Sequence, residues 1–414
     1  MGASSAKWPD PPTNLKTSDL PKLAFRFVLV IGFVNLFADL TYEGARSVAG
    51  PFLGSLGASA TVVGFVAGFG ELMGYGLRSI TGYIADKTHR YWIVIFAGYF
   101  VNMFAVPALA LAGNWPMAAV LLVAERTGRA IRKPAVEAML SQAGKSIGQG
   151  WVFGLNEALD QTGATVGPLI VALVLYRHGG YRHGFAVLFI SAVLCLGTLA
   201  IARILYPHSD ELEERTARPL QARGFSNRYW LYLAGAALVA AGFADFALIG
   251  FHFQHTGVVP QSVIPVFYAA AMGTGAVSSL IFGRLWDHVG RPVLLAAFLL
   301  PVAFAPLVFL GGFGVALAGM ILWGIGMGAQ DSLLKAVLAD LIPSQRRATG
   351  FGLFDTGFGV AWFAGSAAMG WLYDRSIPAV IVFSVVLQLA ALPFLYRAAA
   401  SLRRRDGDER LQGL

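Results

Sequence analysis

Charged residues are scarce in this chain. Of its 414 residues, 31 are Lys or Arg and 23 are Asp or Glu, so 13% carry a charge, whereas 56% are hydrophobic. A soluble domain has about 25% charged residues and needs polar groups to cover its surface. The single cysteine, Cys195, excludes an internal disulfide. The composition therefore excludes an ordinary soluble enzyme, a disordered chain and a disulfide-stabilised domain.

Motifs of enzymes and nucleic-acid-binding proteins are missing as well. Gly144-Lys145-Ser146 has the ending of a phosphate-binding loop, but Met139 stands where that loop needs its first glycine. The chain contains no H-E-x-x-H. Gly144-Lys145-Ser146-Ile147-Gly148 has the G-x-S-x-G spacing, but it lies between two long apolar runs and not at the strand-to-helix turn that this motif needs. The net charge of the chain is +8, but its basic residues do not form a folded basic domain, so nucleic-acid binding is not expected. We expect no enzymatic activity, no cofactor and no bound metal.

Long apolar runs dominate the chain instead. Each is about 20 residues or longer, which is enough to cross a hydrocarbon core of about 30 Å. They predict an all-α membrane protein with twelve transmembrane helices, at about 24–52, 59–84, 92–113, 116–140, 150–176, 184–206, 229–254, 261–284, 292–311, 315–341, 349–373 and 377–397. Residues 1–21 are polar and have no apolar core, so no cleavable signal peptide is expected.

The basic residues predict the topology. With both ends inside, the outer loops hold only Arg177, Arg182 and Arg375, and the other loops and tails hold the remaining basic residues outside the spans. Such asymmetry places both termini in the cytoplasm of a bacterial-type inner membrane. The polar stretch 207–228 predicts a cytoplasmic linker. The expected domains are therefore a tail at 1–23, six-helix bundles at 24–206 and 229–397, and a second tail at 398–414.

An internal repeat relates the two halves. Gly82-Tyr83-Ile84-Ala85-Asp86 with Arg90 recurs as Gly283-Arg284-Leu285-Trp286-Asp287 with Arg291. Phe37-Ala38-Asp39 recurs as Phe243-Ala244-Asp245, and Phe153-Gly154-Leu155 with Glu157 recurs as Phe351-Gly352-Leu353 with Asp355. The matches keep their order and fall at equivalent spans. They predict two pseudo-symmetric bundles related by an axis along the membrane normal.

The doubled G-x-x-x-D-x-x-x-R loop resembles the signature loop of the major facilitator superfamily. Arg126 with Gly128 in span 4, and Gly163-Ala-Thr-Val-Gly167-Pro168 in span 5, resemble motifs of its drug/proton antiporter branch. The resemblance implies a two-bundle transporter in which spans 1, 4, 7 and 10 line a central cavity, spans 2, 5, 8 and 11 join the halves, and spans 3, 6, 9 and 12 face lipid. It also implies that loop residues stabilise the outward-facing state through neighbouring helix ends: Asp86, Arg90, Asp287 and Arg291.

Charges within the spans fit that arrangement. A charge at the bilayer centre costs about 2.5–3.5 kcal/mol on insertion scales, and the interiors of spans 3, 6, 9 and 12 contain none. In span 1, Asp39, Glu43 and Arg46 share one helical face, with Tyr42 adjacent. Two carboxylates beside one guanidinium predict that Asp39 or Glu43 binds a proton. The alternative is a static Glu43–Arg46 pair.

Other intramembrane residues complete the predicted site. Arg126 either modulates an acid on span 1 or 5 or forms a packing salt bridge with Glu125 or Glu157. Asp245 repeats Asp39 and is a second candidate for proton coupling. Asp331 and Lys335 are four residues apart and are expected to form a neutralised pair. The residues expected to line the substrate cavity are Tyr42, Arg46, Glu125, Arg126, Trp323, Asp331 and Lys335. Gating or static bonding is expected of the acids on spans 5 and 11, namely Glu157, Asp160 and Asp355.

These features predict a monomeric, proton-coupled secondary transporter that exports a small organic solute by alternating access, with protons and membrane lipid as its other partners. Import of a charged nutrient or metal complex, with Arg46 and Arg126 as anion ligands, is one alternative. Movement of lipid headgroups on the same fold is another.

Overall fold

A computed structural model describes residues 20–88, 90–206, 225–342 and 347–399. Most of the predicted tails, 1–23 and 398–414, and of the predicted linker, 207–228, lies outside the described residues. The division of the chain at that linker therefore stays a prediction.

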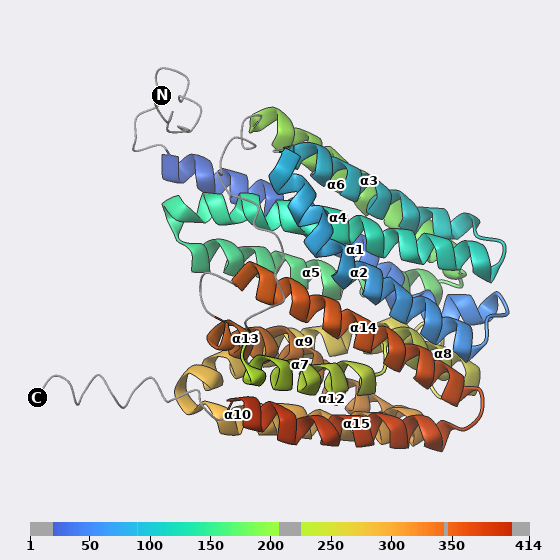
Figure 1. The fold of residues 1–414 in the computed structure, drawn as a ribbon. Coiled ribbons are helices and arrows are strands. Elements are labelled where there is room, and N and C mark those ends of the chain that lie inside the picture. Colours follow the sequence, from blue (N-terminus) through green and yellow to red (C-terminus); the bar gives the residue numbers. More distant parts are fainter. Residues whose placement is uncertain (1–19, 89, 207–224, 343–346, 400–414) are drawn as a thin grey trace, which may run out of the picture. The chain divides into compact units, whose positions relative to one another are not determined.

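Long helices form the first half of the chain (Figure 1). Each overlaps one predicted span, because an apolar segment in lipid satisfies its backbone hydrogen bonds within the helix. They are α1 (Leu20–Ser55), α2 (Ala60–Thr88), α3 (Tyr91–Ala108) continued by the 3-10 turn η2 (Leu109–Leu111), α4 (Trp115–Ile147), α5 (Gln149–Tyr176) and α6 (Tyr181–Leu205).

In the second half of the chain, several predicted spans are interrupted helices. Predicted span 7 is α7 (Asn227–Gly242) and α8 (Phe246–Thr256), and span 9 is α10 (Arg291–Leu299), η4 (Leu300–Ala303) and α11 (Phe304–Leu310). Span 10 is α12 (Phe313–Ala329), a π-turn η5 (Gln330–Leu334) and α13 (Lys335–Leu341). The remaining helices are continuous: α9 (Ile264–Val289), α14 (Arg347–Tyr373) and α15 (Ile377–Ala398). No strand occurs in the described ranges.

Ten segments of the described chain are long and apolar enough to cross a membrane. The other two predicted spans, α4 and α14, are also long helices. Helix α4 is long enough to cross a membrane but less apolar than the ten segments, because Glu125, Arg126, Arg129 and Arg132 lie within one stretch of eight residues. The all-α membrane fold is thereby confirmed, and α4 is marked as the helix with the densest intramembrane charge.

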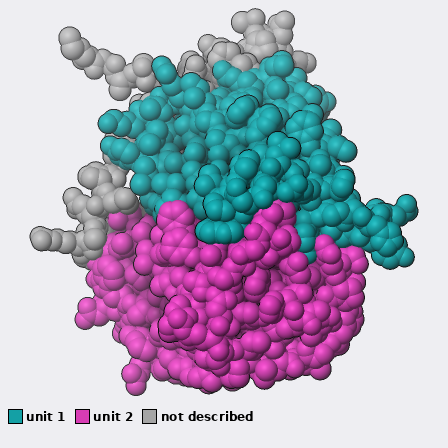
Figure 2. Space-filling model, turned by 90° about the vertical axis from the view of Figure 1, so that its right-hand side faces the viewer, with its two compact units in different colours: residues 1–49, 73–219 teal, residues 50–72, 220–414 magenta. Residues whose placement is uncertain are grey.

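Contacts divide the chain into two compact units, coloured separately in Figure 2. Unit 1 contains Met1–Ala49 and Met73–Pro219, and unit 2 contains Gly50–Leu72 and Leu220–Leu414. The end of α1 and the start of α2 therefore belong to the same compact unit as the second half of the chain.

Glycines set the helix spacing in unit 1. A Cβ on Gly128 of α4 would lie 2.7 Å from the carbonyl oxygen of Gly98 in α3. A Cβ on Gly163 or Gly167 of α5 would lie 2.4 or 2.3 Å from the carbonyl oxygens of Leu36 and Leu40 in α1. Such approaches require the absent side chain. The predicted Gly163–Pro168 motif thus packs α5 backbone-to-backbone on α1 at Leu36 and Leu40.

Unit 2 satisfies the backbone at the α7–α8 break. Ser384 Oγ donates to the Gly242 carbonyl at 2.6 Å, and Trp323 Nε1 donates to the Ala244 carbonyl at 2.9 Å. Asp245 Oδ1 accepts from the Ala247 amide at 2.9 Å and so caps α8. The carbonyls at Gly242 and Ala244 thus have side-chain donors, which an interruption of a transmembrane helix requires.

Candidate functional site

A buried polar cluster lies inside unit 1, between α1, α3, α4 and α5. We call it the polar cluster and define it by Asn35, Asp39, Tyr42, Glu43, Arg46, Tyr99, Asn102, Glu125, Arg126, Arg129, Arg132, Asn156 and Asp160. Four of its members are acids and four are arginines. Because buried charges are costly unless paired, such a balance is expected inside a membrane bundle.

Helix α1 presents one charged face to the cluster. Asp39 and Glu43 are 7% and 3% exposed, one helical turn apart. The Tyr42 hydroxyl is hydrogen-bonded to Asp39. Polar side chains at spacings of three and four residues lie on one side of a helix, which places these groups together as the sequence predicts.

Glu43 lies between two guanidinium groups. Its Oε1 is 3.9 Å from Arg46 Nη1 on the same helix and 3.8 Å from Arg129 Nη1 on α4. The predicted Glu43–Arg46 pair is therefore part of a triad. This arrangement ties α1 to α4 at the level of the acids.

Arg129 and Arg132 face Asp39 from α4. The Arg129 guanidinium carbon is 4.4 Å from the centre of the Tyr42 ring, and that of Arg132 is 4.2 Å from the centre of the Tyr99 ring. A guanidinium over an aromatic face is held by cation–π attraction while its N–H groups stay available. The two arginines are thus positioned by aromatic rings beside the buried acid.

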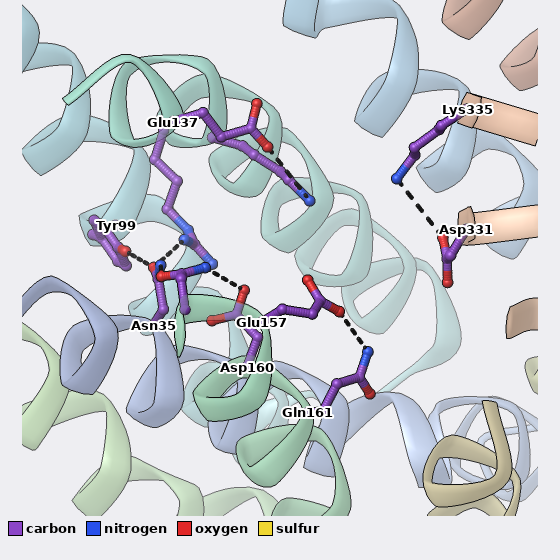
Figure 3. Close-up of polar contacts among 11 residues, drawn as sticks. Asn35, Tyr99, Glu137, Glu157, Asp160, Gln161, Asp331 and Lys335 are labelled. Atoms are coloured by element: carbon purple, nitrogen blue, oxygen red, sulfur yellow. Dashed lines mark hydrogen bonds and ion pairs between the residues drawn. The ribbon is translucent and has the colours of Figure 1, made fainter. Parts of the chain in front are cut away.

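Asn35 connects α1 with three other helices (Figure 3). Its Oδ1 accepts from the Tyr99 hydroxyl and, at 3.4 Å, from Arg132 Nη1. Its Nδ2 donates to Asn156 Oδ1 at 2.7 Å, and Asn156 Nδ2 donates to Asp160 Oδ2 at 3.0 Å. Hydrogen bonds therefore run without interruption from α3 and α4 through α1 to the carboxylate on α5.

Arg126 is paired with its chain neighbour. Its Nε lies 3.4 Å from Glu125 Oε2, and Asn102 Nδ2 donates to Glu125 Oε1 at 2.9 Å. This is the contact that the packing alternative describes, whereas Arg129 and Arg132 lie beside Asp39. Arg129 thus contacts the span-1 acid Glu43, and the charges of Arg129 and Arg132 act on Asp39.

Several predicted residues lie in other surroundings. Asp245 caps α8, and Trp323 is fully buried among Phe243, Phe246 and Tyr268. Lys335 Nζ is 4.0 Å from Asp331 Oδ1, with both side chains more than half exposed.

Of the predicted gating residues, Asp160 belongs to the polar cluster. Glu157 accepts a hydrogen bond from Gln161 at 2.8 Å, and Asp355 is half-buried on α14. Arg90 is exposed at the start of α3, and the side chains of Asp86, Asp287 and Arg291 lie outside the described part.

Sequence reasoning missed Asn35, Tyr99, Asn102 and Asn156, and it assigned no role to Arg129 or Arg132. A signal for them exists: Arg126, Arg129 and Arg132 recur every three residues on α4, and Asn35 stands one turn before Asp39. The partners of Asn35, however, lie 64, 97 and 121 residues away in the chain, at Tyr99, Arg132 and Asn156.

The sequence profile of the Major Facilitator Superfamily matches residues 31–366 and, in a second match, residues 262–412. The chain belongs to this superfamily. As a member it is an integral membrane transporter and not an enzyme. Membership in the drug/proton antiporter branch stays a prediction.

Relatives and solved structures agree with this assignment. An uncharacterised protein of Mycobacterium bovis is 38% identical over 379 residues, which cover 90% of this chain and 93% of the relative. An uncharacterised MFS-type transporter of Methanocaldococcus jannaschii is 24% identical, and the match covers 87% of this chain and 92% of the relative.

The nucleoside transporter NupG has a TM-score of 0.67 at 12% identity, covering 91% of this chain and 99% of NupG. The peptide transporter POT has a TM-score of 0.69 at 14% identity, covering 90% and 95%. These two structures share the fold.

Proposed function

We propose that this superfamily member is a proton-coupled secondary transporter that exports a small organic solute across a bacterial-type inner membrane by alternating access. The observation that carries the proposal is the environment of Asp39. This buried carboxyl group faces the guanidiniums of Arg129 and Arg132 and is hydrogen-bonded by Tyr42. The structural neighbours named as nucleoside and peptide transporters support an organic solute.

Protonation is the charge change that this environment allows. Arginine keeps its charge in proteins, so the acids are the members of the cluster that titrate. Ionised Asp39 attracts Arg129 and Arg132, and a proton on Asp39 removes that attraction. Protonation of Asp39 therefore changes which contacts the α1 face makes. It shifts the equilibrium between two conformations of the transporter by the difference between their affinities for the proton.

Export follows when proton and solute compete for the same carboxylates. A solute with a cationic or hydrogen-bond-donating group binds Asp39 or Glu43 in the ionised form. A proton arriving from the outer side neutralises the acid and releases the solute there. The inward proton gradient thus drives the solute outward, with both termini cytoplasmic as the basic residues predict.

Import of an anionic solute is the second candidate. When Asp39 is protonated, Arg129 and Arg132 lose a carboxylate partner and are free to bind an anionic group. Arg129 supports this alternative because its side chain is 21% exposed, against 12% for Arg46 and for Arg126. In this scheme proton and anion move together.

Transport into proteoliposomes under an imposed pH gradient tests the proposal. The probes are nucleosides, dipeptides, organic cations and organic anions, with solute movement followed by radiolabel and proton movement by a trapped pH dye. Asp39→Asn and Glu43→Gln should abolish gradient-driven accumulation, because a neutral side chain cannot exchange a proton for the solute, whereas Asp340→Asn, which removes an exposed acid on α13, should leave it unchanged. Full gradient-driven transport in both variants would overturn the coupling role, and solute and protons moving in the same direction would select import.

A further inference from the structure

The same short pattern occurs on two helices of unit 1. Asn35 precedes Asp39 by four residues on α1, and Asn156 precedes Asp160 by four residues on α5. In both helices the four-residue spacing places asparagine and aspartate on one face. The sequence alone predicts proton coupling for Asp39 and gating or static bonding for Asp160, with no relation between the two acids.

Helices α1 and α5 pack in parallel register along these patterns. The two asparagines are joined by the 2.7 Å bond from Asn35 Nδ2 to Asn156 Oδ1. Further along, a Cβ on Gly163 would lie 3.0 Å from the Cβ of Asp39, and a Cβ on Gly167 would lie 3.0 Å from the amide nitrogen of Gly44. The contacts on either side of Asp160, at Asn156 and Gly163, thus fall on Asn35 and Asp39 of α1, which places Asp160 alongside the helical turn that joins these two residues.

The groups that face the two acids are shared between them. Asp39 interacts electrostatically with Arg129, Arg132 and Glu43, and it is hydrogen-bonded to Tyr42. Asp160 interacts electrostatically with Asp39 itself, and with Glu157, Lys133 and Arg132. Arg132 is therefore a cation common to both carboxyl groups, and the charge of Asp39 acts on Asp160.

The two oxygens of Asp160 differ. Oδ2 accepts the hydrogen bond from Asn156, whereas Oδ1 is buried without a hydrogen-bond partner among the described residues. A buried acceptor without a partner is unfavourable, and more so when it carries charge. A proton shared at this position turns an unsatisfied acceptor into a donor.

We propose that Asp39 and Asp160 form a carboxyl pair that binds one proton between them. Two carboxylates at one site beside one common guanidinium do not both ionise readily, so the pair titrates as a unit. One proton binds to give a pair with a single negative charge, and the same proton leaves to give two carboxylates, while Arg132 stays charged throughout. The part this pair plays in transport rests on the proposed function.

Infrared difference spectroscopy of the full-length protein in lipid nanodiscs tests the pair directly. The carbonyl stretch of a protonated carboxyl group, identified by its shift in D₂O, is followed as the pH is varied on both sides of neutrality. We expect one such band at neutral pH that is lost in Asp39→Asn and equally lost in Asp160→Asn, because the remaining acid then ionises beside Arg132. The band should persist in Asp340→Asn, which removes an exposed acid on α13.

A band that survives in Asp160→Asn but is lost in Asp39→Asn would overturn the pair, since Asp39 alone would then hold the proton. Absence of the band in the wild type would overturn it as well. If Asp160→Asn does not fold, Asp39→Glu and Asp160→Glu give the answer. Both should move the pH midpoint of the band, and movement in only one of them contradicts sharing.

Transport measurements separate this inference from the proposed function. Loss of the band in both variants, together with wild-type transport that ignores the pH gradient, would leave the pair standing and remove proton coupling. Gradient-driven transport that persists in Asp160→Asn, together with a persisting band, would leave proton coupling standing and remove the pair.

Discussion

Asp374 binds the first turn of α2 through Thr61. Its Oδ2 accepts from the Thr61 amide at 2.9 Å and from the Thr61 hydroxyl at 2.5 Å, and its Oδ1 accepts from the Ala60 amide at 3.0 Å. Asp374 directly follows α14, so one carboxylate supplies the amide acceptors that a helix start lacks and also places a negative charge at its positive end. Within unit 2 this contact ties the start of α2 to the end of α14.

Removal of this carboxylate should destabilise the protein. Asp374→Ala takes away three hydrogen bonds and the charge at the helix terminus, and we expect a loss of about 1–2 kcal/mol in the free energy of unfolding. Denaturant unfolding of the purified protein in detergent measures it. Asp340→Ala, which removes an exposed acid on α13, is the matched control, and equal stability of the two variants would contradict the capping role.

The contribution of Asp374 should also depend on pH. Burial by itself raises the pKa of Asp374, but hydrogen bonds from Thr61, Ala60 and Ser59 outweigh it and hold the pKa below its ordinary value. A carboxyl group with a lowered pKa in the folded state stabilises above its unfolded pKa of about 4 and loses that effect as pH falls through the folded value. The melting-temperature difference between wild type and Asp374→Ala should therefore shrink below about pH 4. A difference that stays constant on acidification would contradict this account.

Close packing of α5 on α1 should not tolerate a side chain at Gly167. In Gly167→Ala the new Cβ would meet the Leu40 carbonyl oxygen at 2.3 Å, so the helices must separate. Overpacking of this kind costs about 1–3 kcal/mol. Gly154 lies on the same helix, and a Cβ added there would have nothing within 4 Å, so Gly154→Ala is the control. Thermal unfolding should show a lower midpoint for Gly167→Ala alone.

Helix positions follow closely from the sequence, whereas helix interruptions do not. The apolar run at 24–52 corresponds to α1, Leu20–Ser55, because hydropathy and length alone decide that a segment spans the bilayer. Phe37-Ala38-Asp39 and its repeat Phe243-Ala244-Asp245 nevertheless differ, since the first is helical and the second lies in the break. Trp323 supplies a donor to the Ala244 carbonyl at this break. Such partners come from distant helices and leave no mark on the local sequence.

The candidate site shows the same limit. Spacing along one helix was enough to place Asp39, Glu43 and Arg46 on one face. It was not enough to join Asp160 to Asp39, because that relation depends on the register of α5 against α1. The glycine motif on α5 was recognised from sequence, but the side chains that it brings together became visible only with both helices in place.

The hydrogen-bond donor of Trp323 at the α7–α8 break can be removed without leaving a cavity in its place. Trp323→Phe keeps an aromatic ring against Phe243 and Phe246 but deletes the Nε1–H that bonds the Ala244 carbonyl. Loss of one partner of a buried hydrogen bond costs about 1–3 kcal/mol, and we expect that loss in denaturant unfolding. Trp230→Phe changes an exposed tryptophan on α7 and should cost little. Equal unfolding midpoints for the two variants would show that this bond does not stabilise the break.

The shared position of Glu43 predicts an order of effects among charge variants. Glu43→Gln removes a carboxylate that both Arg46 and Arg129 approach, whereas Arg46→Gln leaves Arg129 beside Glu43 and Arg129→Gln leaves Arg46 there. Breaking a buried pair on one side costs about 3–5 kcal/mol, so Glu43→Gln should be the most destabilising of the three.

A double-mutant cycle checks that the effect comes from the charges themselves. Glu43→Gln with Arg129→Gln should cost less than the sum of the single variants, because the double variant leaves fewer unbalanced charges in the bundle. Lys133 and Glu137, 3.9 Å apart on α4 with side chains 36% and 53% exposed, provide the control cycle. Solvent screens that pair, so its coupling should be about 0–1 kcal/mol. Coupling of Glu43 with Arg129 no larger than this would mean that the triad contributes no more to folding than a surface ion pair does.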